Sequence, residues 1–396
     1  MLSDRVVRIV ASPTMKVTAE AKKLTSEGIN VIDLSVGEPD FPTPQNIKDA
    51  AKKAIDENHT KYTINAGTVE LRKAIVNKFK RDNNLDYSLN EVIVSSGAKQ
   101  SIFNAILSTV SRDDEVIVPA PYWVSYPEMI SLAEGRTIVI ETSETNGFRI
   151  TPDQLEKAVS PKTKIFILCN PSNPTGSAYN RKQLDEIAEV VSKFSFLVIS
   201  DEIYEKLLYD NFEFISFASL NEEMKKRTIL VNGVSKTYSM TGWRVGYTAG
   251  PEEVIKAMDK IQSHSTSHAS SISQQATIES LNGPNDYLRI MQEEFHKRRD
   301  YLFDQLLSID GISCYKPEGA FYLFPNFSFY MNRTYNGTRI NNSLDLAMYL
   351  LNEAKIALVP GSAFGAEGFI RFSYATSMEN LGEAVKRLKE AIEKLN

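Results

Sequence analysis

The sequence predicts an α/β protein with a large domain, whose seven-stranded and mostly parallel sheet is flanked by helices, and a smaller α+β domain built from both chain ends. Three observations lead to this prediction. The chain has 396 residues, which is more than one hydrophobic core usually serves. Short β-rich runs alternate with longer stretches of helical periodicity between residues 45 and 290. After residue 290 this alternation gives way to a different pattern.

Seven short apolar runs are the predicted strands of the large sheet. They occupy residues 92–94, 116–118, 138–140, 165–168, 197–199, 229–231 and 245–247. The segments between them carry helix start signals, and we expect one helix to open at Thr68 and another at Asn180.

The second domain is expected to contain a long charged helix over residues 293–307, a meander over 311–324 and helices near Leu344 and Leu381. The polar stretch 331–342 predicts an exposed loop. We expect residues 1–40 to form an N-terminal arm and part of this small domain. The predicted division is therefore 1–40, 41–290 for the large cofactor-binding domain, and 291–396 for the small C-terminal domain.

The composition excludes several classes of protein. Lys and Arg number 45 against 50 Asp and Glu, a net charge of -5, which does not suggest nucleic-acid binding. No apolar run could span a bilayer, and the first residues carry no secretory signal, so we expect a cytoplasmic protein. Cys169 and Cys314 are predicted to be reduced thiols. Any anionic ligand would need a local positive pocket.

The segment 232–246 carries the most informative chemistry. It reads NGVSKTYSMTGWRVG and follows an apolar strand. A cofactor that forms a Schiff base needs a primary amine in a protected cavity, and a phosphate needs a hydroxyl and a guanidinium. Lys236, Ser235 and Arg244 have these groups. A lysine beside a turn is usually a solvated surface residue, but the apolar strand, Trp243 and two glycines favour a buried site.

Asp201 stands at the end of another apolar strand, where α/β sheets bind ligands. A carboxylate held against a heterocyclic nitrogen would keep that nitrogen protonated and the ring electron-withdrawing. Tyr204, three residues on, could reach the same ligand. The alternative is that Asp201 caps a following helix.

Two further segments follow strands. The loop 170–176, NPSNPTG, is fixed by two prolines and a glycine. Asn173 could therefore present its amide to a ligand at little cost in conformational entropy, and an ordinary turn is the alternative.

In the segment 94–100, VSSGAKQ, a strand runs into a helix through small residues. The backbone amides at that helix start would bind a phosphate.

These segments, in this order, resemble the fold-type I aminotransferases that use pyridoxal 5′-phosphate, specifically the bacterial branch of the class I, aspartate aminotransferase-like enzymes. Further motifs carry the resemblance: VGEPDFPTP at 36–44, Lys61-Tyr62, PYWVSYP at 121–127, GAFY at 319–322 and IRFSY at 370–374. The resemblance covers nearly the whole chain, and the lysine segment matches the family signature at every fixed position.

The resemblance implies a role for each matching residue around the cofactor ring. Lys236 would bind pyridoxal 5′-phosphate as a Schiff base and then move a proton at the substrate α-carbon. Asp201 would pair with the pyridine nitrogen, Tyr204 and Asn173 would hydrogen-bond the phenolic oxygen, and Trp123 would stack on the ring.

The resemblance also implies the residues that hold the cofactor phosphate. It would lie on the amides of Gly97 and Ala98, beside Ser235 and Arg244. Tyr62 would come from the other subunit, which makes a homodimer part of the site.

For the substrate, the resemblance implies that Arg371 binds the α-carboxylate, assisted by the backbone of Gly37 and flanked by Trp123 and Asn173. The stretch 262–270, QSHSTSHAS, lacks the second arginine that many aspartate aminotransferases use for the distal carboxylate. In the bacterial branch a lysine takes that place, here Lys99, joined by the hydroxyls of Ser12 and Thr14.

Lys99 is expected in the first turn of a helix, where the helix dipole disfavours a cation, so its presence there hints at an anionic partner; a solvent-facing lysine is the alternative. We therefore expect amino transfer from L-aspartate to 2-oxoglutarate, giving oxaloacetate and L-glutamate. Alternatives are a prephenate, aromatic or other amino-acid aminotransferase, and a lyase that eliminates a β-substituent on the same fold.

Other chemistry finds little support in the sequence. His264 and His268 are four residues apart, but two further ligands are lacking, so a loop or interface position is favoured over a metal site, and no metal is expected. Cys169 stands where the family often has asparagine and is expected to pack in the core. No Gly-x-Gly-x-x-Gly or Walker motif suggests a nucleotide site.

Overall fold

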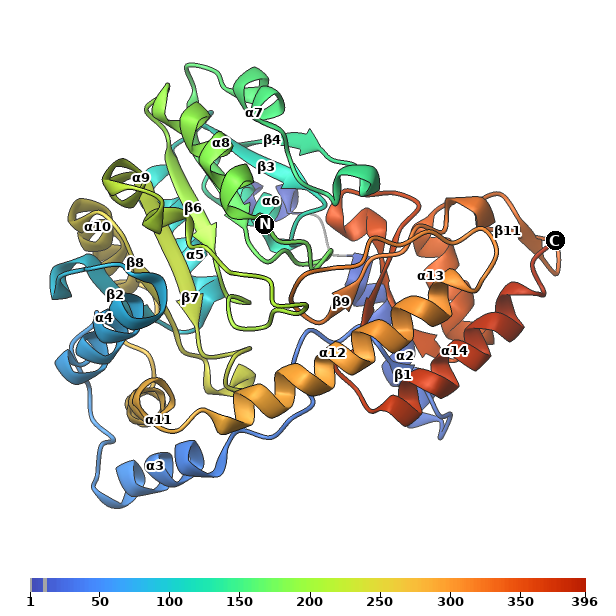
Figure 1. The fold of residues 1–396 in the computed structure, drawn as a ribbon, viewed down its shortest axis with the longest axis horizontal. Helices are drawn as coiled ribbons and strands as arrows, with labels where there is room; N and C mark the ends of the chain where they lie inside the picture. Colours follow the sequence, from blue (N-terminus) through green and yellow to red (C-terminus); the bar gives the residue numbers. More distant parts are fainter. Residues whose placement is uncertain (1, 10–12) are drawn as a thin grey trace.

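The computed structural model describes residues 2–9 and 13–396 and confirms the predicted fold class (Figure 1). The seven-stranded sheet has the order β2-β8-β7-β6-β5-β3-β4. Its strands are β2 (Val92–Ser95), β3 (Glu115–Ala120), β4 (Arg136–Glu141), β5 (Thr163–Cys169), β6 (Leu197–Asp201), β7 (Thr228–Gly233) and β8 (Gly246–Ala249). All are parallel except β8, which runs antiparallel to both of its neighbours. Every predicted strand is present.

Helices cover both faces of this sheet. Alternate residues of each strand point to opposite sides, and both sets are apolar, so each face needs a covering layer. On β5, Ile165 and Ile167 pack with α5 (Ala98–Thr109), α6 (Ser125–Leu132) and α10 (Glu252–Ser263). Phe166 and Leu168 pack on the other face, with α7 (Pro152–Ala158), α8 (Arg181–Ser192) and α9 (Glu222–Arg227). Near β2 and β8, the sheet packs against α3 (Gln45–Asp56), α4 (Val69–Asn83) and α11 (Ser271–Asn282).

The two predicted helix starts are confirmed. Thr68 caps α4 by accepting a hydrogen bond from the amide of Leu71. Asn180 caps α8 and forms a reciprocal capping box with Gln183. Both caps satisfy amides that the first helical turn leaves without a partner.

The second region is built on the long helix α12 (Asp286–Leu307), with α13 (Ser343–Glu353) and α14 (Met378–Ile392) beside it (Figure 1). They enclose an antiparallel sheet of β13 (Val359–Pro360), β14 (Ile370–Ser373) and β9 (Tyr322–Leu323). The expected loop 331–342 contains a short hairpin, β10 (Thr334–Tyr335) and β11 (Thr338–Arg339). The predicted domain boundary at residue 290 falls inside α12, four residues after this helix begins. The division of the chain into domains stays a prediction.

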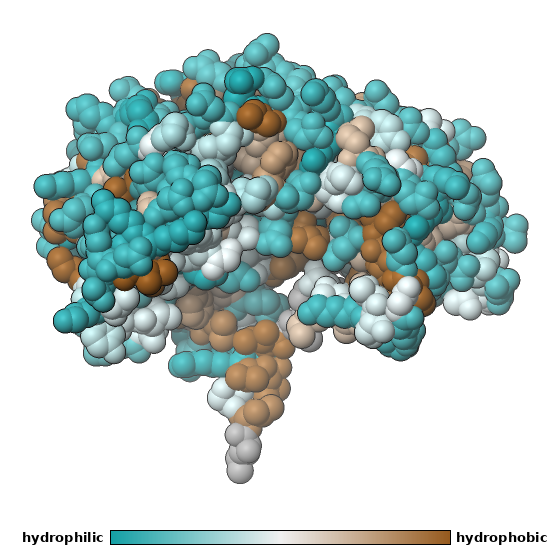
Figure 2. All heavy atoms as spheres, turned by 90° about the horizontal axis from the view of Figure 1, so that it is seen from below, coloured by the Kyte–Doolittle hydropathy of each residue, from teal (hydrophilic) through white to brown (hydrophobic). Residues whose placement is uncertain are grey.

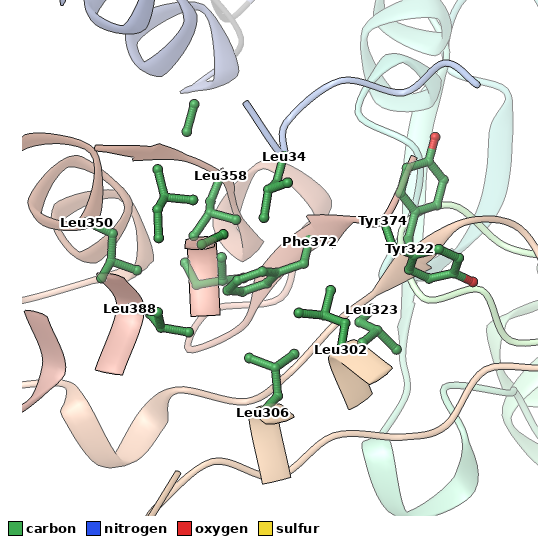
Figure 3. Packing of buried hydrophobic residues seen from close by; sticks show 14 of the residues in the cluster. Leu34, Leu302, Leu306, Tyr322, Leu323, Leu350, Leu358, Phe372, Tyr374 and Leu388 are labelled. Atoms are coloured by element: carbon green, nitrogen blue, oxygen red, sulfur yellow. The ribbon is translucent and has the colours of Figure 1, made fainter. Parts of the chain in front are cut away.

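Residues near the N-terminus pack against this second region. The short strand β1 (Ile32–Asp33) pairs in parallel with β12 (Ile356–Ala357), and α2 (Pro13–Ser26) contacts α13. Leu34 lies in the same buried cluster as Leu358 and Phe372 (Figure 3). The chain therefore leaves this core after Leu34 and returns to it with α12, whose first buried residue, Met291, lies 257 residues further on.

The first helix, α1 (Asp4–Arg8), is anchored lightly. Arg5 and Arg8 both lie within 4 Å of Glu134, at 3.9 and 3.6 Å. Leu2, Val6 and Val7 are exposed, and Figure 2 shows apolar side chains on a segment that projects from the body of the molecule. Among the described residues, no helix is both long and apolar enough to cross a bilayer.

Candidate active site

A cavity of about 390 Å³ lies where β2, β3, β5, β6 and β7 end. These strands are parallel, so the segments that follow them meet at one edge of the sheet. The cavity is lined by most of the predicted site residues: Thr14, Gly37, Ala98, Lys99, Trp123, Asn173, Asp201, Tyr204, Ser235, Lys236, Arg244 and Arg371. The structure thus brings together residues that are spread over the whole chain.

The charge of the lining is strongly positive although the protein is acidic. Lys99, Lys236, Arg244 and Arg371 face the cavity, and Asp201 is the carboxylate among the lining residues. This excess of cations is the local positive pocket that an anionic ligand requires.

Lys236 lies in the turn after β7, and its Nζ donates a hydrogen bond to the carbonyl of Gly37. Burial lowers the pKa of its amine to about 8, an effect that the charges of Arg371 and Arg244 reinforce and those of Glu38 and Asp201 oppose. About a tenth of this amine is therefore neutral and nucleophilic at pH 7, against less than about a thousandth of an ordinary lysine.

Asp201 is the last residue of β6 and is only 5% exposed. Its Oδ2 accepts a hydrogen bond of 2.6 Å from the hydroxyl of Tyr126. Burial raises the pKa of this carboxyl, against the opposing effects of Tyr126, the amide of Ile203 and Lys236. The residues after Asp201 form turns rather than an α-helix, so the alternative of a helix cap is wrong.

Arg371 projects from β14 and is 6% exposed. Its Nη1 donates to Oδ1 of Asn173 at 2.9 Å and its Nη2 to the carbonyl of Ser35 at 2.6 Å. Its Nε is buried and has no hydrogen-bond partner among the described residues. A buried donor without a partner is costly, so this guanidinium retains capacity for an anion such as a carboxylate.

The start of α5 and Arg244 face each other closely. Gly97 precedes the helix with φ of +92°, and a Cβ at this position would lie 2.2 Å from Nη2 of Arg244. Only glycine permits this approach. The guanidinium and the helix start together favour an anion, with Ser235 in the same lining. Gly97 is itself not a lining residue, and its own amide donates to the carbonyl of Ser95 at 2.7 Å.

Lys99 lies in the first turn of α5, as predicted, with its Nζ 4.9 Å from the ring centre of Trp123. Burial, and to a lesser extent Arg244, lower the pKa of its amine. No carboxylate of the described residues pairs with it in an ion pair. Thr14, in the first turn of α2, lines the cavity.

One predicted site residue, Tyr62, lies away from this cavity. Tyr62 is 93% exposed, and its ring packs edge-to-face against His268 at 5.7 Å rather than lining this chain's cavity. Ser12 lies outside the described residues. Cys169, the last residue of β5, pairs with Asp201 in the sheet and lines the cavity, and both cysteines are free.

Sequence reasoning missed two residues of the site. Tyr126 lies three residues after Trp123 and donates to Asp201, while Tyr322 lines the cavity and contacts both Tyr204 and Arg371. Both belong to the motifs PYWVSYP and GAFY, which carried the resemblance without a role for these tyrosines.

The chain belongs to the class I and II aminotransferase family, whose model matches residues 29–388. It is 48% identical to the aspartate/prephenate aminotransferase of Nitrosomonas europaea, over 98% of both chains. The crystal structure of an aspartate aminotransferase from Rhizobium meliloti superposes with a TM-score of 0.97 at 44% identity, covering both chains fully. An aspartate aminotransferase of Thermus thermophilus solved with maleate gives a TM-score of 0.93 at 39% identity, over 99% of each chain.

Proposed function

We propose that this enzyme transfers the amino group of L-aspartate to 2-oxoglutarate with pyridoxal 5′-phosphate as cofactor. One observation carries the proposal: a single cavity joins a buried amine, Lys236, to two further cations, Arg371 and Lys99. Among the residues that the structure describes, Arg371 Nε has no hydrogen-bond partner and Lys99 has no ion-pair partner. A substrate with two carboxylates has one anion for each of the two latter groups. The similarity to aspartate aminotransferases, one of them solved with the dicarboxylate maleate, supports the choice.

The residues present fit the cofactor. Gly97 leaves space for Arg244 at a helix start, which suits a phosphate, and Asp201 is a buried carboxylate that suits a protonated ring nitrogen. Tyr204 and Asn173 would hold the ring oxygen, Trp123 would stack on the ring, and Ser235 with the amide of Ala98 would complete the phosphate site. When bound, the cofactor supplies an electron-withdrawing ring that stabilises negative charge at the substrate α-carbon.

The chain's own groups then perform three tasks. Arg371, held by Asn173 and the carbonyl of Ser35, binds and orients the α-carboxylate. Lys236 Nζ takes the proton from the α-carbon and returns one later, which its pKa of about 8 permits in both directions near neutral pH. Apolar lining residues such as Ile102 and Phe364 exclude water from the reacting atoms.

A second candidate substrate is prephenate, or another amino-acid partner with a ring. Val17, Ile102 and Leu358 give the cavity an apolar wall, and the relative from Nitrosomonas europaea carries both substrates in its name. Lys99 would bind a distal carboxylate in either case. A lyase reaction on the same fold would need the same cofactor residues, and its ammonia and oxo-acid products would distinguish it.

Amino-acid half-reactions test the substrate directly. Aspartate, glutamate, phenylalanine and arogenate are each mixed with the purified enzyme, and loss of the visible absorbance of the bound cofactor is followed. We expect aspartate and glutamate to react fastest, and Lys99→Gln to slow them at least about tenfold through loss of a charge-assisted contact. Lys182→Gln, which removes an exposed lysine of α8, is the matched control. Faster reaction with phenylalanine, or no effect of Lys99→Gln on aspartate, would contradict the dicarboxylate proposal.

We also propose a cytoplasmic homodimer, with the domain division 1–40, 41–290 and 291–396. Two features support the dimer: Tyr62 is exposed away from this chain's cavity, and α1 presents apolar side chains to solvent. A second copy that receives Tyr62 at its phosphate site would cover such a surface.

A further inference from the structure

Tyr322 links the two ends of the cavity. It lies on β9, is fully buried and lines the cavity. Its hydroxyl is 2.8 Å from the hydroxyl of Tyr204, and the guanidinium of Arg371 lies 4.4 Å from its ring centre. Tyr322 thus contacts one residue proposed to bind the cofactor and one proposed to bind the substrate.

The hydroxyl pair has a defined direction once a ligand oxygen is present. A tyrosine hydroxyl has a single proton to donate. If Tyr204 donates its proton to an oxygen of a molecule in the cavity, that proton cannot also be shared with Tyr322. The hydroxyl of Tyr322 must then be the donor in the hydrogen bond between the two tyrosines. Tyr204 then donates more strongly, because hydrogen bonds in a chain polarise one another.

The surroundings of the pair favour this direction. Burial raises the pKa of both hydroxyls, but Arg371 opposes the rise most directly at Tyr322 and so makes it the better donor. Arg371 and Cys169 are the other titratable groups that act on the pair, and burial raises the pKa of the Cys169 thiol to about 12, which keeps it neutral.

We propose that Tyr322 is a positioning residue that acts on both Tyr204 and Arg371. Its hydroxyl donates to Tyr204 and strengthens the hydrogen bond of Tyr204 to the cofactor ring oxygen. Its ring packs against Arg371 and holds that guanidinium in place for the substrate carboxylate. This inference rests on the proposed function, since it assumes that the cofactor and an amino acid occupy the cavity. It assigns one residue to the coupling of two subsites.

A spectroscopic titration of the holoenzyme tests the hydroxyl. The visible absorption of the bound cofactor changes with pH as the nitrogen of Lys236 gains or loses its proton. Tyr322→Phe keeps the ring and removes the donor, so negative charge on the cofactor oxygen is less stable and the proton is held more tightly. We expect the midpoint of this titration to rise by about 0.5–1 pH unit.

Tyr374→Phe is the matched control. Tyr374 is equally buried, and Figure 3 shows it beside Tyr322 with its hydroxyl oxygen pointing elsewhere; that hydroxyl donates to the carbonyl of Ala320 at 3.3 Å. Its loss should leave the midpoint unchanged. An unshifted midpoint in Tyr322→Phe, or an equal shift in Tyr374→Phe, would overturn the proposed hydrogen-bond role.

A second variant tests the ring. Tyr322→Leu removes the surface beneath Arg371, so the KM for the amino acid should rise about fivefold or more above that of Tyr322→Phe, in line with the loss of a desolvated cation–π contact. Equal KM values in the two variants would overturn this part. A wild-type protein that takes up no cofactor would instead refute the proposed function, so the two failures are distinguishable.

Discussion

Burial of one amine decides the chemistry at the residue scale. Lys236 has no carboxylate within ion-pair distance among the described residues, and its Nζ bonds a backbone carbonyl instead. The low polarity around it disfavours the ammonium form, so its pKa falls from 10.5 to about 8. An ordinary surface lysine would be almost entirely protonated, and therefore unreactive, at neutral pH.

This burial predicts how fast the cofactor-free protein takes up pyridoxal 5′-phosphate as the pH changes. Only the neutral amine attacks an aldehyde, so the rate should rise with pH and level off above about 8, where most Lys236 has lost its proton. Stopped-flow absorbance of the recombining protein measures it. A rate that keeps climbing to about pH 10.4, the ordinary lysine value, would contradict a buried amine.

Single residues also show where sequence reasoning ends. Lys236, Asp201 and Arg371 could be found because each follows or occupies a short apolar strand within a recognisable motif. The roles of Tyr126 and Tyr322 could not, because each depends on a partner 75 or 118 residues away in the chain. Such contacts are set by the packing of the two regions, which local patterns do not encode.

At the scale of elements, strand ends and helix starts build the site. Each predicted strand was found within a few residues, since apolar β-rich runs are buried between helices. The reversed direction of β8 was not predicted. In this strand Gly246 passes close to the start of α5, where a Cβ would lie 2.2 Å from the amide nitrogen of Ala98. This approach brings the segment that carries Arg244 back to the helix start.

The glycine before α5 gives a test at this scale. Gly97→Ala would place a Cβ against the Arg244 guanidinium at a backbone φ of +92°, so the phosphate site should open and the cofactor dissociation constant should rise at least about tenfold. Titration of the cofactor-free protein measures it. Gly28→Ala is the matched control, because Gly28 also has a positive φ, +82°, but nothing lies within 4 Å of its added Cβ. Equal cofactor binding by both variants would refute the close approach.

At the scale of the whole molecule, the site joins two regions of one chain. Arg371 on β14 is held by Asn173 of the large sheet and by the carbonyl of Ser35 near the N-terminus. The proposed dimer adds Tyr62 from a second chain. Sequence patterns alone predicted the fold class, and the assignment of residues 1–40 to the small domain stays a prediction. The proposed dimer rests only on the family resemblance and the exposed surface.

Mixing two impaired variants tests the shared site. Lys236→Ala removes the amine and Tyr62→Ala removes the residue proposed to cross the interface. If the chains are allowed to exchange, a mixed dimer has one site with both residues intact, so about a quarter of wild-type activity should appear. The separately kept variants are the control. No recovery from chains that sedimentation shows to have exchanged would mean that Tyr62 acts within its own subunit or not at all.

The most direct test of the central claim is to identify the lysine that bears the cofactor. The purified protein is reduced with borohydride, digested, and its peptides are mapped by mass spectrometry. We predict a pyridoxal 5′-phosphate adduct on Lys236 and none on any peptide of the Lys236→Ala variant. A protein without visible absorbance, or an adduct on a different lysine such as Lys99, would contradict the claim that this cavity is a cofactor site built around Lys236.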